Sequence, residues 1–255
     1  MSTFDYDESA VAREEANYQT PTARERRAFV RDQLAIESGE SILSVGCGPG
    51  FEPAELAEAE PSARVTGVDV NPMMLARTRE RCSGEVALLR GTATDLPVED
   101  GSFDVAVSVQ VYEYIEDVAD ALVELHRVLD DDGRALVYAT DWDSLIWRAG
   151  DDARAERVLE IWDDHCVHPN LGSELQAVLH SSPFTIENVT AFPIVLTDLG
   201  EDSFAHHLLE FIREFVSQHL ESETAQKWAD DVRTLDRRGE TFFSLCQYSY
   251  LIESE

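Results

Sequence analysis

The sequence predicts an α/β protein whose core is a doubly wound, mostly parallel β-sheet. Short apolar segments recur along residues 41–139, and stretches with helical periodicity separate them. The first segment, Ser41–Val45, runs directly into three glycines at alternate positions, and the second, Arg64–Val68, ends at an aspartate. Strands that alternate with helices in this order specify a parallel sheet with helices on both faces.

Residues 1–40 are expected to form a helical cap. A helix over Glu14–Tyr18 is interrupted at Thr20-Pro21, and a second helix over Ala23–Ile36 places apolar side chains on one stripe. Gly39 ends this second helix and precedes the first strand.

The core of the sheet is expected over residues 41–140. The expected strands are Ser41–Val45, Arg64–Val68, Val86–Leu89, Phe103–Val109 and Arg134–Ala139, and the expected helices are Phe51–Glu58, Met73–Cys82 and Asp117–Leu129. Asn71-Pro72 opens the second of these helices, because asparagine caps a helix and proline fits its first turn. The turn residues Asp100-Gly101 and Asp130–Gly133 precede the last two strands.

The regular alternation of expected strands and helices ends after Thr140. The expected elements there are a largely helical segment Trp142–Leu179, a sixth strand Thr185–Thr197, two helices within Ser203–Arg238 and a last strand Thr241–Ile252. Helical insertions therefore follow the fifth strand and separate the sixth from the seventh. We expect a single domain over residues 1–255, in which residues 141–255 place these helices over the carboxyl edge of the sheet.

The chain is strongly acidic, with 51 Asp and Glu against 20 Lys and Arg and a formal charge of −31. Lys227 is the only lysine, which is typical of extreme halophiles, although an acidic mesophilic protein is an alternative. Molar salt shortens the Debye length to about 3 Å and so screens self-repulsion. An acidic surface repels nucleic acid backbones, so we expect no nucleic acid partner. The sequence has neither an apolar run of membrane-spanning length nor a signal-peptide pattern, so we expect a cytoplasmic protein.

Glycines and acidic residues that follow the expected strands converge at one edge of the sheet. Gly46, Gly48 and Gly50 follow the first strand, Asp69 ends the second, and Asp95 follows the third. Open α/β sheets bind ligands at this carboxyl edge, where the strand order reverses. Glycine lets the backbone come close to a ligand, and Asp69 lies 19 residues beyond Gly50, a spacing at which a carboxylate reaches ribose hydroxyls.

On these residues the sequence resembles class I S-adenosylmethionine-dependent methyltransferases, in particular the group related to ubiquinone and menaquinone biosynthesis methyltransferases (methyltransferase type 11 domain). The resemblance covers Tyr18–Thr140 well and the later part loosely. It implies a Rossmann-like sheet of seven strands in the order 3-2-1-4-5-7-6, with strand 7 antiparallel, and S-adenosyl-L-methionine as cofactor. The cofactor-binding residues that it implies are Gly46, Cys47, Gly48, Gly50, Asp69, Val70, Asn71, Met73, Thr94, Asp95, Leu96 and Gln110.

The resemblance also implies in-line transfer of the methyl group to a small-molecule acceptor. Because the sulfonium is already activated, the protein mainly orients the acceptor and excludes water, and no residue is assigned as catalytic. The expected acceptor-side residues are Tyr18, Tyr112, Tyr114, Trp142, Trp147 and His165, with Glu113 beside them. Apolar residues in the two insertions allow a hydrophobic acceptor such as a quinone or lipid precursor, and packing in the core explains them equally well.

Two alternatives to this enzyme remain open on the sequence. A dehydrogenase with a dinucleotide site is disfavoured, because Phe51 stands where its third small residue belongs and Glu52 in the next helix turn would repel a pyrophosphate. A regulatory protein that binds the cofactor without transfer is the other alternative. The chain also differs from the family at Ser44, where an acidic residue is usual. This difference concerns the water-mediated contact with the amino acid part of the cofactor.

No metal site is expected. Cys47, Cys82, Cys166 and Cys246 form no CxxC pair, which indicates reduced thiols and gives little support to arsenite methylation. His165 and His168 are expected to share one face of a helix, with Cys166 about 100° away, so the three residues do not converge on one metal ion. A role for one of these histidines as general base is an alternative to a structural position.

Overall fold

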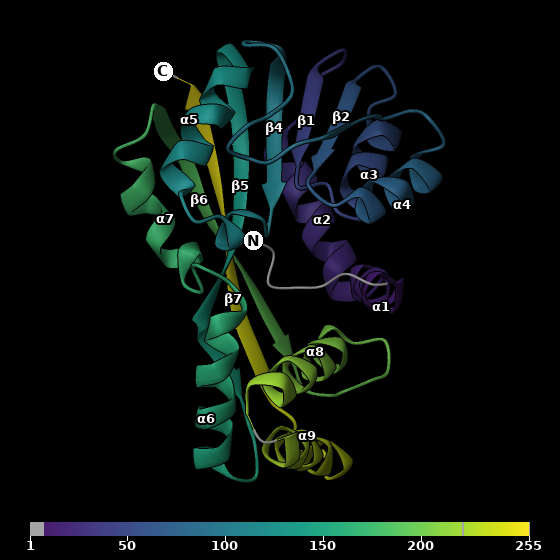
Figure 1. Cartoon of the computed structure of the whole chain (residues 1–255), viewed down its shortest axis with the longest axis vertical. Coiled ribbons are helices and arrows are strands. Elements are labelled where there is room, and N and C mark those ends of the chain that lie inside the picture. The colour runs from purple at the N-terminus through teal and green to yellow at the C-terminus, as the bar shows by residue number, and fades with distance from the viewer. Residues whose placement is uncertain (1–7, 221, 255) are drawn as a thin grey trace.

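The computed structural model describes residues 8–220 and 222–254, apart from the side chains of residues 9 and 10. Within this part of the chain, a seven-stranded sheet has the strand order β3-β2-β1-β4-β5-β7-β6 (Figure 1). β7 is antiparallel to both β5 and β6, and the other neighbouring pairs are parallel. The predicted α/β class, the strand order and the antiparallel seventh strand are confirmed.

Helices and strands follow each other along the chain much as the sequence predicted. The strands are β1 (Ser41–Val45), β2 (Arg64–Asp69), β3 (Ala87–Arg90), β4 (Phe103–Val109), β5 (Leu129–Trp147), β6 (Phe184–Leu196) and β7 (Phe243–Ser254). The helices are α1 (Glu8–Tyr18), α2 (Pro21–Leu34), α3 (Phe51–Ala59), α4 (Pro72–Cys82), α5 (Val118–Val128), α6 (Asp152–Trp162), α7 (Leu171–Leu179), α8 (Phe204–His219) and α9 (Ser222–Arg237), with the 3₁₀ turns η1 (Tyr112–Tyr114) and η2 (Asp163–His165). Helical insertions follow β5 and separate β6 from β7, as expected.

Both faces of the sheet are buried under helices. Along β4, Val105 and Val107 belong to the apolar cluster that includes α2, α3 and α4. Ala106, between them, belongs to the cluster that includes α5 and α7. Side chains alternate between the two faces of a strand, so burial of both faces accounts for the continuous apolar sequence of the central strands.

Three long strands extend beyond the rest of the sheet and carry further helices (Figure 1). β5, β6 and β7 have 19, 13 and 12 residues, whereas β1 has five. Their extended ends pack with α6, α8 and α9 around a separate apolar cluster. We call these helices and strand ends the lower part, and β1–β4 with α2–α5 the upper part.

Strand β5 is longer than the sequence predicted. We expected it to end at Ala139 and a helix to follow from Trp142, whereas pairing with β7 continues to Trp147. A register shift between Asp141 and Ile146 interrupts the ladder without ending it. The expectation was wrong because the partner strand lies far along the chain, and local periodicity does not report it.

The start of α4 agrees with the sequence prediction. Asn71 caps α4: its Oδ1 accepts a hydrogen bond from Met73 N at 2.8 Å, and Pro72 follows in the first turn. Two further positions differ clearly from the expectation. α1 begins at Glu8 rather than Glu14, and the turn expected at Asp130–Gly133 lies within β5.

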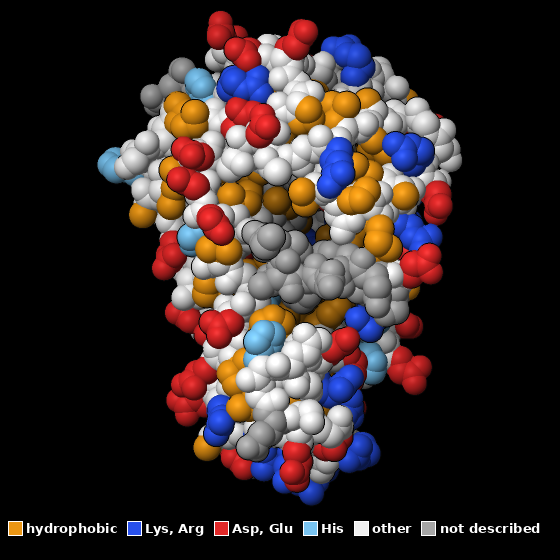
Figure 2. Space-filling model, in the orientation of Figure 1, with side chains coloured by type: hydrophobic (Ala, Val, Ile, Leu, Met, Phe, Trp, Pro, Cys, Tyr) orange, Lys and Arg blue, Asp and Glu red, His pale blue; other side chains and the backbone are white. Residues whose placement is uncertain are grey.

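Acidic side chains are spread over the surface of both parts (Figure 2), in keeping with the formal charge of −31. Several of the carboxylates pair with arginine, as Glu40 does with Arg134 at 2.7 Å. In residues 8–220 and 222–254, none of the helices combines the length and the apolar character that crossing a bilayer requires.

Candidate functional site

A large cavity lies where the upper and lower parts meet. Its volume is about 890 Å³, within the range of about 300–1,000 Å³ that is typical of small-molecule sites. The loops after β1 and β4 contribute to one wall, and side chains of α8 contribute to the opposite wall. Figure 2 shows hydrophobic side chains on this face above and below the level at which the two parts meet. The strand order reverses between β1 and β4, so the cavity lies where α/β sheets bind ligands.

The glycine turn after β1 forms part of the upper wall. Gly46, Gly48 and Gly50 have φ angles of +66°, +52° and +86°, in the left-handed region that glycine adopts without steric cost. Asp69 at the end of β2 fixes this turn, because its Oδ2 accepts a hydrogen bond from Gly48 N at 2.8 Å. Its Oδ1 accepts one from Asn71 N, also at 2.8 Å. Burial raises the pKa of the Asp69 carboxyl, and these N–H donors oppose the shift.

The three glycines have different surroundings. A Cβ on Gly46 would lie 2.4 Å from the Val111 side chain, and one on Gly50 would lie 2.7 Å from Thr78 Cα. A Cβ on Gly48 would meet only Tyr18 Oη, at 3.6 Å. Gly46 and Gly50 therefore allow protein segments to pack closely, whereas Gly48 presents bare backbone to the cavity.

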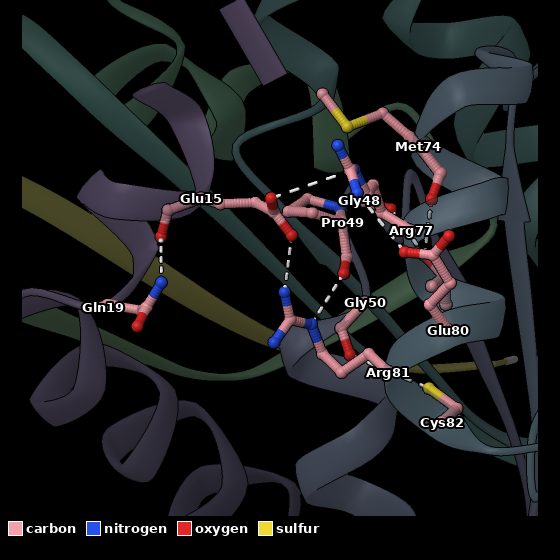
Figure 3. A network of polar contacts seen from close by, with 11 residues as sticks. Glu15, Gln19, Gly48, Pro49, Gly50, Met74, Arg77, Glu80, Arg81 and Cys82 are labelled. Carbon is pink, nitrogen blue, oxygen red and sulfur yellow. Dashed lines mark hydrogen bonds and ion pairs between the residues drawn. The ribbon is translucent and has the colours of Figure 1, made fainter. Parts of the chain in front are cut away.

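Helices α1 and α4 brace the outer side of the glycine turn (Figure 3). Arg81 Nε donates a hydrogen bond to Pro49 O at 2.9 Å, and Arg81 Nη2 pairs with Glu15 of α1 at 2.7 Å. The same guanidinium lies 3.5 Å from the centre of the Phe51 ring. Tyr18, the last residue of α1, also stacks on the Phe51 ring, and the two ring centroids are 5.6 Å apart. These contacts tie α1, and with it Tyr18, to the turn.

Gln110, directly after β4, has an unusual backbone conformation. Its φ of +55° is uncommon for a residue with a Cβ. Its N–H donates to Tyr138 O at 2.8 Å, and its Nε2 donates to Thr140 Oγ1 at 2.9 Å. Arg26 of α2 donates to Gln110 Oε1. Strained positions that are held in this way cluster at functional sites, and Gln110 lines the cavity.

Aromatic side chains form the wall on the side of the lower part. Trp162 stacks on His165 with ring centroids 3.9 Å apart, and Trp142 meets His165 edge-on at 4.8 Å. Phe215 of α8 meets Trp162 edge-on at 5.5 Å. The wall also contains Ile115, Phe204, Leu208 and Phe211. Interlocked rings of this kind give a rigid, largely apolar surface.

His165, Glu14 and Glu113, in or beside the cavity, also have shifted pKa values. Burial lowers the pKa of His165 to about 4, so its ring is neutral at neutral pH. His165 Nδ1 lies 2.5 Å from Trp162 O, which places the ring proton on Nδ1. Burial raises the pKa of Glu14, in the cavity wall, and of Glu113 to about 7. Glu113 Oε1 accepts a hydrogen bond from Thr140 N at 2.8 Å and lies outside the wall.

The cavity brings together many of the residues that the sequence singled out. Those in its wall are Gly46, Gly48, Asp69, Val70, Asn71, Gln110, Tyr18, Tyr114, Trp142 and His165. Those outside the wall are Cys47, Gly50, Met73, Thr94, Asp95, Leu96, Tyr112 and Trp147. Met74 lines the cavity where Met73 was expected, and residues 91–93 line it beside the exposed Thr94 and Asp95.

Two aromatic residues expected on the acceptor side lie in the protein interior. Tyr112 is 1% exposed and belongs to the apolar cluster that includes α5. Trp147 meets Trp228 and Phe243 edge-on, at 5.4 and 4.8 Å. Trp147 lies outside the cavity because the unforeseen extension of β5 carries it down to α9.

His165 and His168 do not share a helix face, contrary to the expectation. α6 ends at Trp162, the 3₁₀ turn η2 ends at His165, and Cys166 is extended with φ −135°. His165 is buried in the cavity wall, whereas His168 Nε2 lies 3.4 Å from Glu116 O at the surface. Across the described residues, no group of three or more His, Cys, Asp or Glu is placed to hold a metal ion.

The sequence predicted that apolar residues of the insertion before β7 lie beside the acceptor, and Phe204, Leu208 and Phe211 of α8 are in the cavity wall. It gave no site role to the other wall residues of α1 and α8, which apart from Tyr18 are Arg13, Glu14, Asn17, Glu214, Phe215 and Gln218. The available signal was the spacing of the four α8 side chains Phe204, Leu208, Phe211 and Phe215, which puts them on one helix face. That spacing is equally typical of core packing, so it does not identify a cavity by itself.

Comparisons with known proteins agree with this geometry. A family model described as a methyltransferase domain matches residues 43–137. An uncharacterized 37.1 kDa transposon protein of Streptomyces fradiae is 31% identical over 216 residues, which are 83% of this chain and 63% of the relative. Demethylmenaquinone methyltransferase of Chlorobaculum tepidum is 37% identical over 107 residues, 42% of this chain and 43% of the relative. This chain therefore spans less than two thirds of the length of these relatives.

Solved structures support the fold. The crystal structure of a putative methyltransferase from Bacillus halodurans superposes with a TM-score of 0.65 at 17% sequence identity. The alignment covers 90% of this chain and 98% of that one. At this identity the likeness concerns the fold.

Proposed function

We propose that this chain transfers a methyl group from S-adenosylmethionine to a small apolar molecule. The chain belongs to the class I S-adenosylmethionine-dependent methyltransferases related to the quinone-biosynthesis enzymes. The observation that carries the proposal is the position of Gly48 and Asp69 in one wall of the 890 Å³ cavity. There, bare backbone and a buried carboxylate lie side by side at the reversal of strand order.

The upper wall suits a nucleoside without phosphates. Asp69 uses one lone pair of each oxygen on a backbone N–H, and a carboxylate has further lone pairs for two adjacent ribose hydroxyls. Gly48 allows the sugar or base to lie directly on the backbone. The N-terminus of α3 is closed to a phosphate, because Gly50 packs on Thr78 and Glu52 occupies the first turn.

The residues of the chain then orient the reactants and exclude water. Bound S-adenosylmethionine supplies the activated methyl group. Gln110, held in its strained conformation between β4 and η1, lies between the upper wall and the aromatic wall. The ring stack of Trp142, Trp162 and His165 would hold the acceptor against the methyl-bearing end, since rigid apolar surfaces orient a flat molecule and keep the site dry.

The charges in the cavity select an uncharged or cationic acceptor. Glu14, Asp69 and Glu214 line it, and the only cation in its wall among the described residues, Arg13, pairs with Glu214 at 3.3 Å. A phosphate or carboxylate on the acceptor would have to enter beside these acidic groups without an unpaired cation, which is unfavourable. We therefore infer an apolar acceptor with a ring or long hydrocarbon portion and no anionic group within the cavity.

Methyl transfer can be tested without knowing the acceptor. S-Adenosylmethionine with a labelled methyl group is incubated with the protein and a lipid-soluble metabolite extract, at molar salt and in dilute buffer. The proposal predicts S-adenosylhomocysteine together with label in an apolar product that carries no anionic group. Label that appears only in anionic, water-soluble products contradicts the acceptor class, and binding of S-adenosylmethionine with no product from any extract contradicts the enzyme.

A further inference from the structure

A second, much smaller cavity adjoins the large one. Its volume is about 20 Å³, room for one water molecule. It shares Tyr18, Val45, Gly46 and Val109 with the large cavity, so the two spaces have a common wall at the ends of β1 and β4. The other residues around it are Arg26, Arg27, Ser44, Cys47, Glu52 and Val107.

Glu52 is the unusual group in this small cavity. Its side chain lies in the first turn of α3 and is 8% exposed. Neither carboxyl oxygen has a hydrogen-bond partner among the described residues. A buried carboxyl group without a partner is unfavourable, so its presence calls for a ligand or an ordered water.

The neighbouring arginines do not pair with Glu52. Arg27 and Arg31 both bind Glu55, Arg27 at 2.8 Å, and Arg26 donates to Gln110. Glu52 is therefore close to positive charge without being directly neutralised by it. A further cation that reaches the common wall would find an acceptor already in place.

The cofactor of the proposed function carries such a cation. With its ribose at Asp69 on β2, its remaining part would extend along the carboxyl edge of the sheet toward β1 and β4, where the common wall lies. That part ends in an amino acid with an ammonium group. Ser44 near the end of β1 faces the same small cavity and supplies no charge.

We propose, resting on the proposed function, that Glu52 is a positioning residue for the amino acid end of the cofactor. Its carboxylate binds the ammonium group through one water molecule in the small cavity. Glu52 on α3 thus supplies the negative charge that Ser44 on β1 lacks. The geometry behind this assignment is an unpartnered carboxyl and a water-sized space that shares a wall with the large cavity.

Calorimetry with two probes tests the proposal. S-Adenosylhomocysteine has the amino acid end, and 5′-methylthioadenosine has the same nucleoside without it. Glu52→Gln keeps the size of the side chain and removes its charge. We expect this variant to bind S-adenosylhomocysteine about tenfold more weakly, the scale of one lost charge-assisted contact, and to bind 5′-methylthioadenosine as the wild type does.

Two further variants separate this role from a structural one. Glu55→Gln changes another glutamate on α3, one that already pairs with arginine, and should not alter the ratio of the two affinities. The double variant Ser44→Asp/Glu52→Gln should recover most of the lost affinity for S-adenosylhomocysteine, since it returns a carboxylate to the same small cavity.

An unchanged ratio of the two affinities in Glu52→Gln, or an equal loss of both, would overturn the role of Glu52 while leaving the proposed function intact. Failure of the wild type to bind either probe would overturn the proposed function, and the inference with it.

Discussion

The upper wall of the large cavity, which contains the glycine turn, and the aromatic wall on the side of the lower part, here called the lower wall, are held together by different interactions. The upper wall consists largely of backbone held by hydrogen bonds, as where Asp69 accepts the Gly48 N–H at 2.8 Å. The lower wall consists of side chains held by packing, as where Trp162 stacks on His165 at 3.9 Å. Backbone fixes where a common cofactor lies, whereas side chains can change with the acceptor, so we expect damage to the two walls to have separable effects.

The largest effect should come from the glycines of the upper wall. Gly50→Ala combines φ +86° with a Cβ 2.7 Å from Thr78 Cα, and we expect it to lower the free energy of unfolding by about 3 kcal/mol or more. Gly48→Ala meets only Tyr18 Oη, so it should cost about 1–2 kcal/mol for the left-handed backbone. Denaturant melts measure both changes.

The same pair of variants should rank in the opposite order for binding per folded molecule. A methyl group at Gly48 would occupy the surface on which the nucleoside lies, and we expect at least a tenfold loss of affinity for S-adenosylhomocysteine. Equal destabilisation by the two variants, with normal binding by Gly48→Ala, would remove Gly48 from the site.

Asp69→Ala should weaken cofactor binding by about 1.5–3 kcal/mol, because it removes a charged acceptor for ribose hydroxyls and loosens the glycine turn. Asp69→Asn keeps one oxygen and should lose less. Titration with S-adenosylhomocysteine and with its 2′-deoxy analogue measures the contact directly. If the wild type does not distinguish the two compounds, Asp69 does not bind the ribose.

Substitutions in the lower wall should weaken binding of the acceptor and leave binding of the cofactor unchanged. Once an acceptor has been found, Phe211→Ala is expected to raise its KM about tenfold through loss of apolar contact, with S-adenosylhomocysteine affinity unchanged. Phe242→Ala removes the same side chain from an exposed position outside the cavity and serves as the control. A fall in cofactor affinity in Phe211→Ala alone would mean that the two walls are not separable.

The smallest effect concerns the pH dependence of cofactor binding, which depends on Glu52 in the small cavity. Burial raises the pKa of Glu52 to about 7, so the group is mostly protonated below that pH and charged above it. Only the charged form attracts an ammonium group, and we expect the preference for S-adenosylhomocysteine over 5′-methylthioadenosine to rise about fivefold from pH 6 to pH 8. In Glu52→Gln the preference should stay flat.

Other titratable groups near Glu52 could contribute to this pH response, so they determine which control variants are needed. The groups that face it or its small cavity are Arg26, Arg27, Arg31, Glu55, Tyr18 and Cys47. Burial raises the pKa of Cys47 to about 12 and that of Tyr18 further, so neither titrates in this window. Glu14, in the large cavity, also has a pKa raised to about 7, so Glu14→Gln is measured alongside. A pH response that disappears in Glu14→Gln and persists in Glu52→Gln would assign it to Glu14.

The upper wall was largely predictable from the sequence, for a physical reason. Gly46, Gly48 and Asp69 stand at fixed distances from strand ends, and strand ends of a parallel sheet meet at one edge. Met73 shows the limit of this reasoning: the helix start was correct, yet Met74 lines the cavity, because one residue rotates the side chain by about 100° around the helix.

The lower wall was less predictable because contacts between distant segments build it. Trp142 and Trp147 looked equivalent in the sequence, but the extension of β5 along β7 places the first in the cavity wall and the second against Trp228. Glu52, in the small cavity, illustrates the same limit. Its position in a first helix turn was evident, whereas its burial beside Ser44 depends on how α2 and α3 pack on β1.

The most direct test of the account is a calorimetric comparison of S-adenosylhomocysteine and NAD binding to the full chain, in the same molar-salt buffer. The upper wall, with Asp69 and bare Gly48 but no open helix N-terminus for a pyrophosphate, predicts one site for S-adenosylhomocysteine and no measurable binding of NAD. Binding of NAD in preference to S-adenosylhomocysteine, or of neither compound at millimolar concentration, would contradict it.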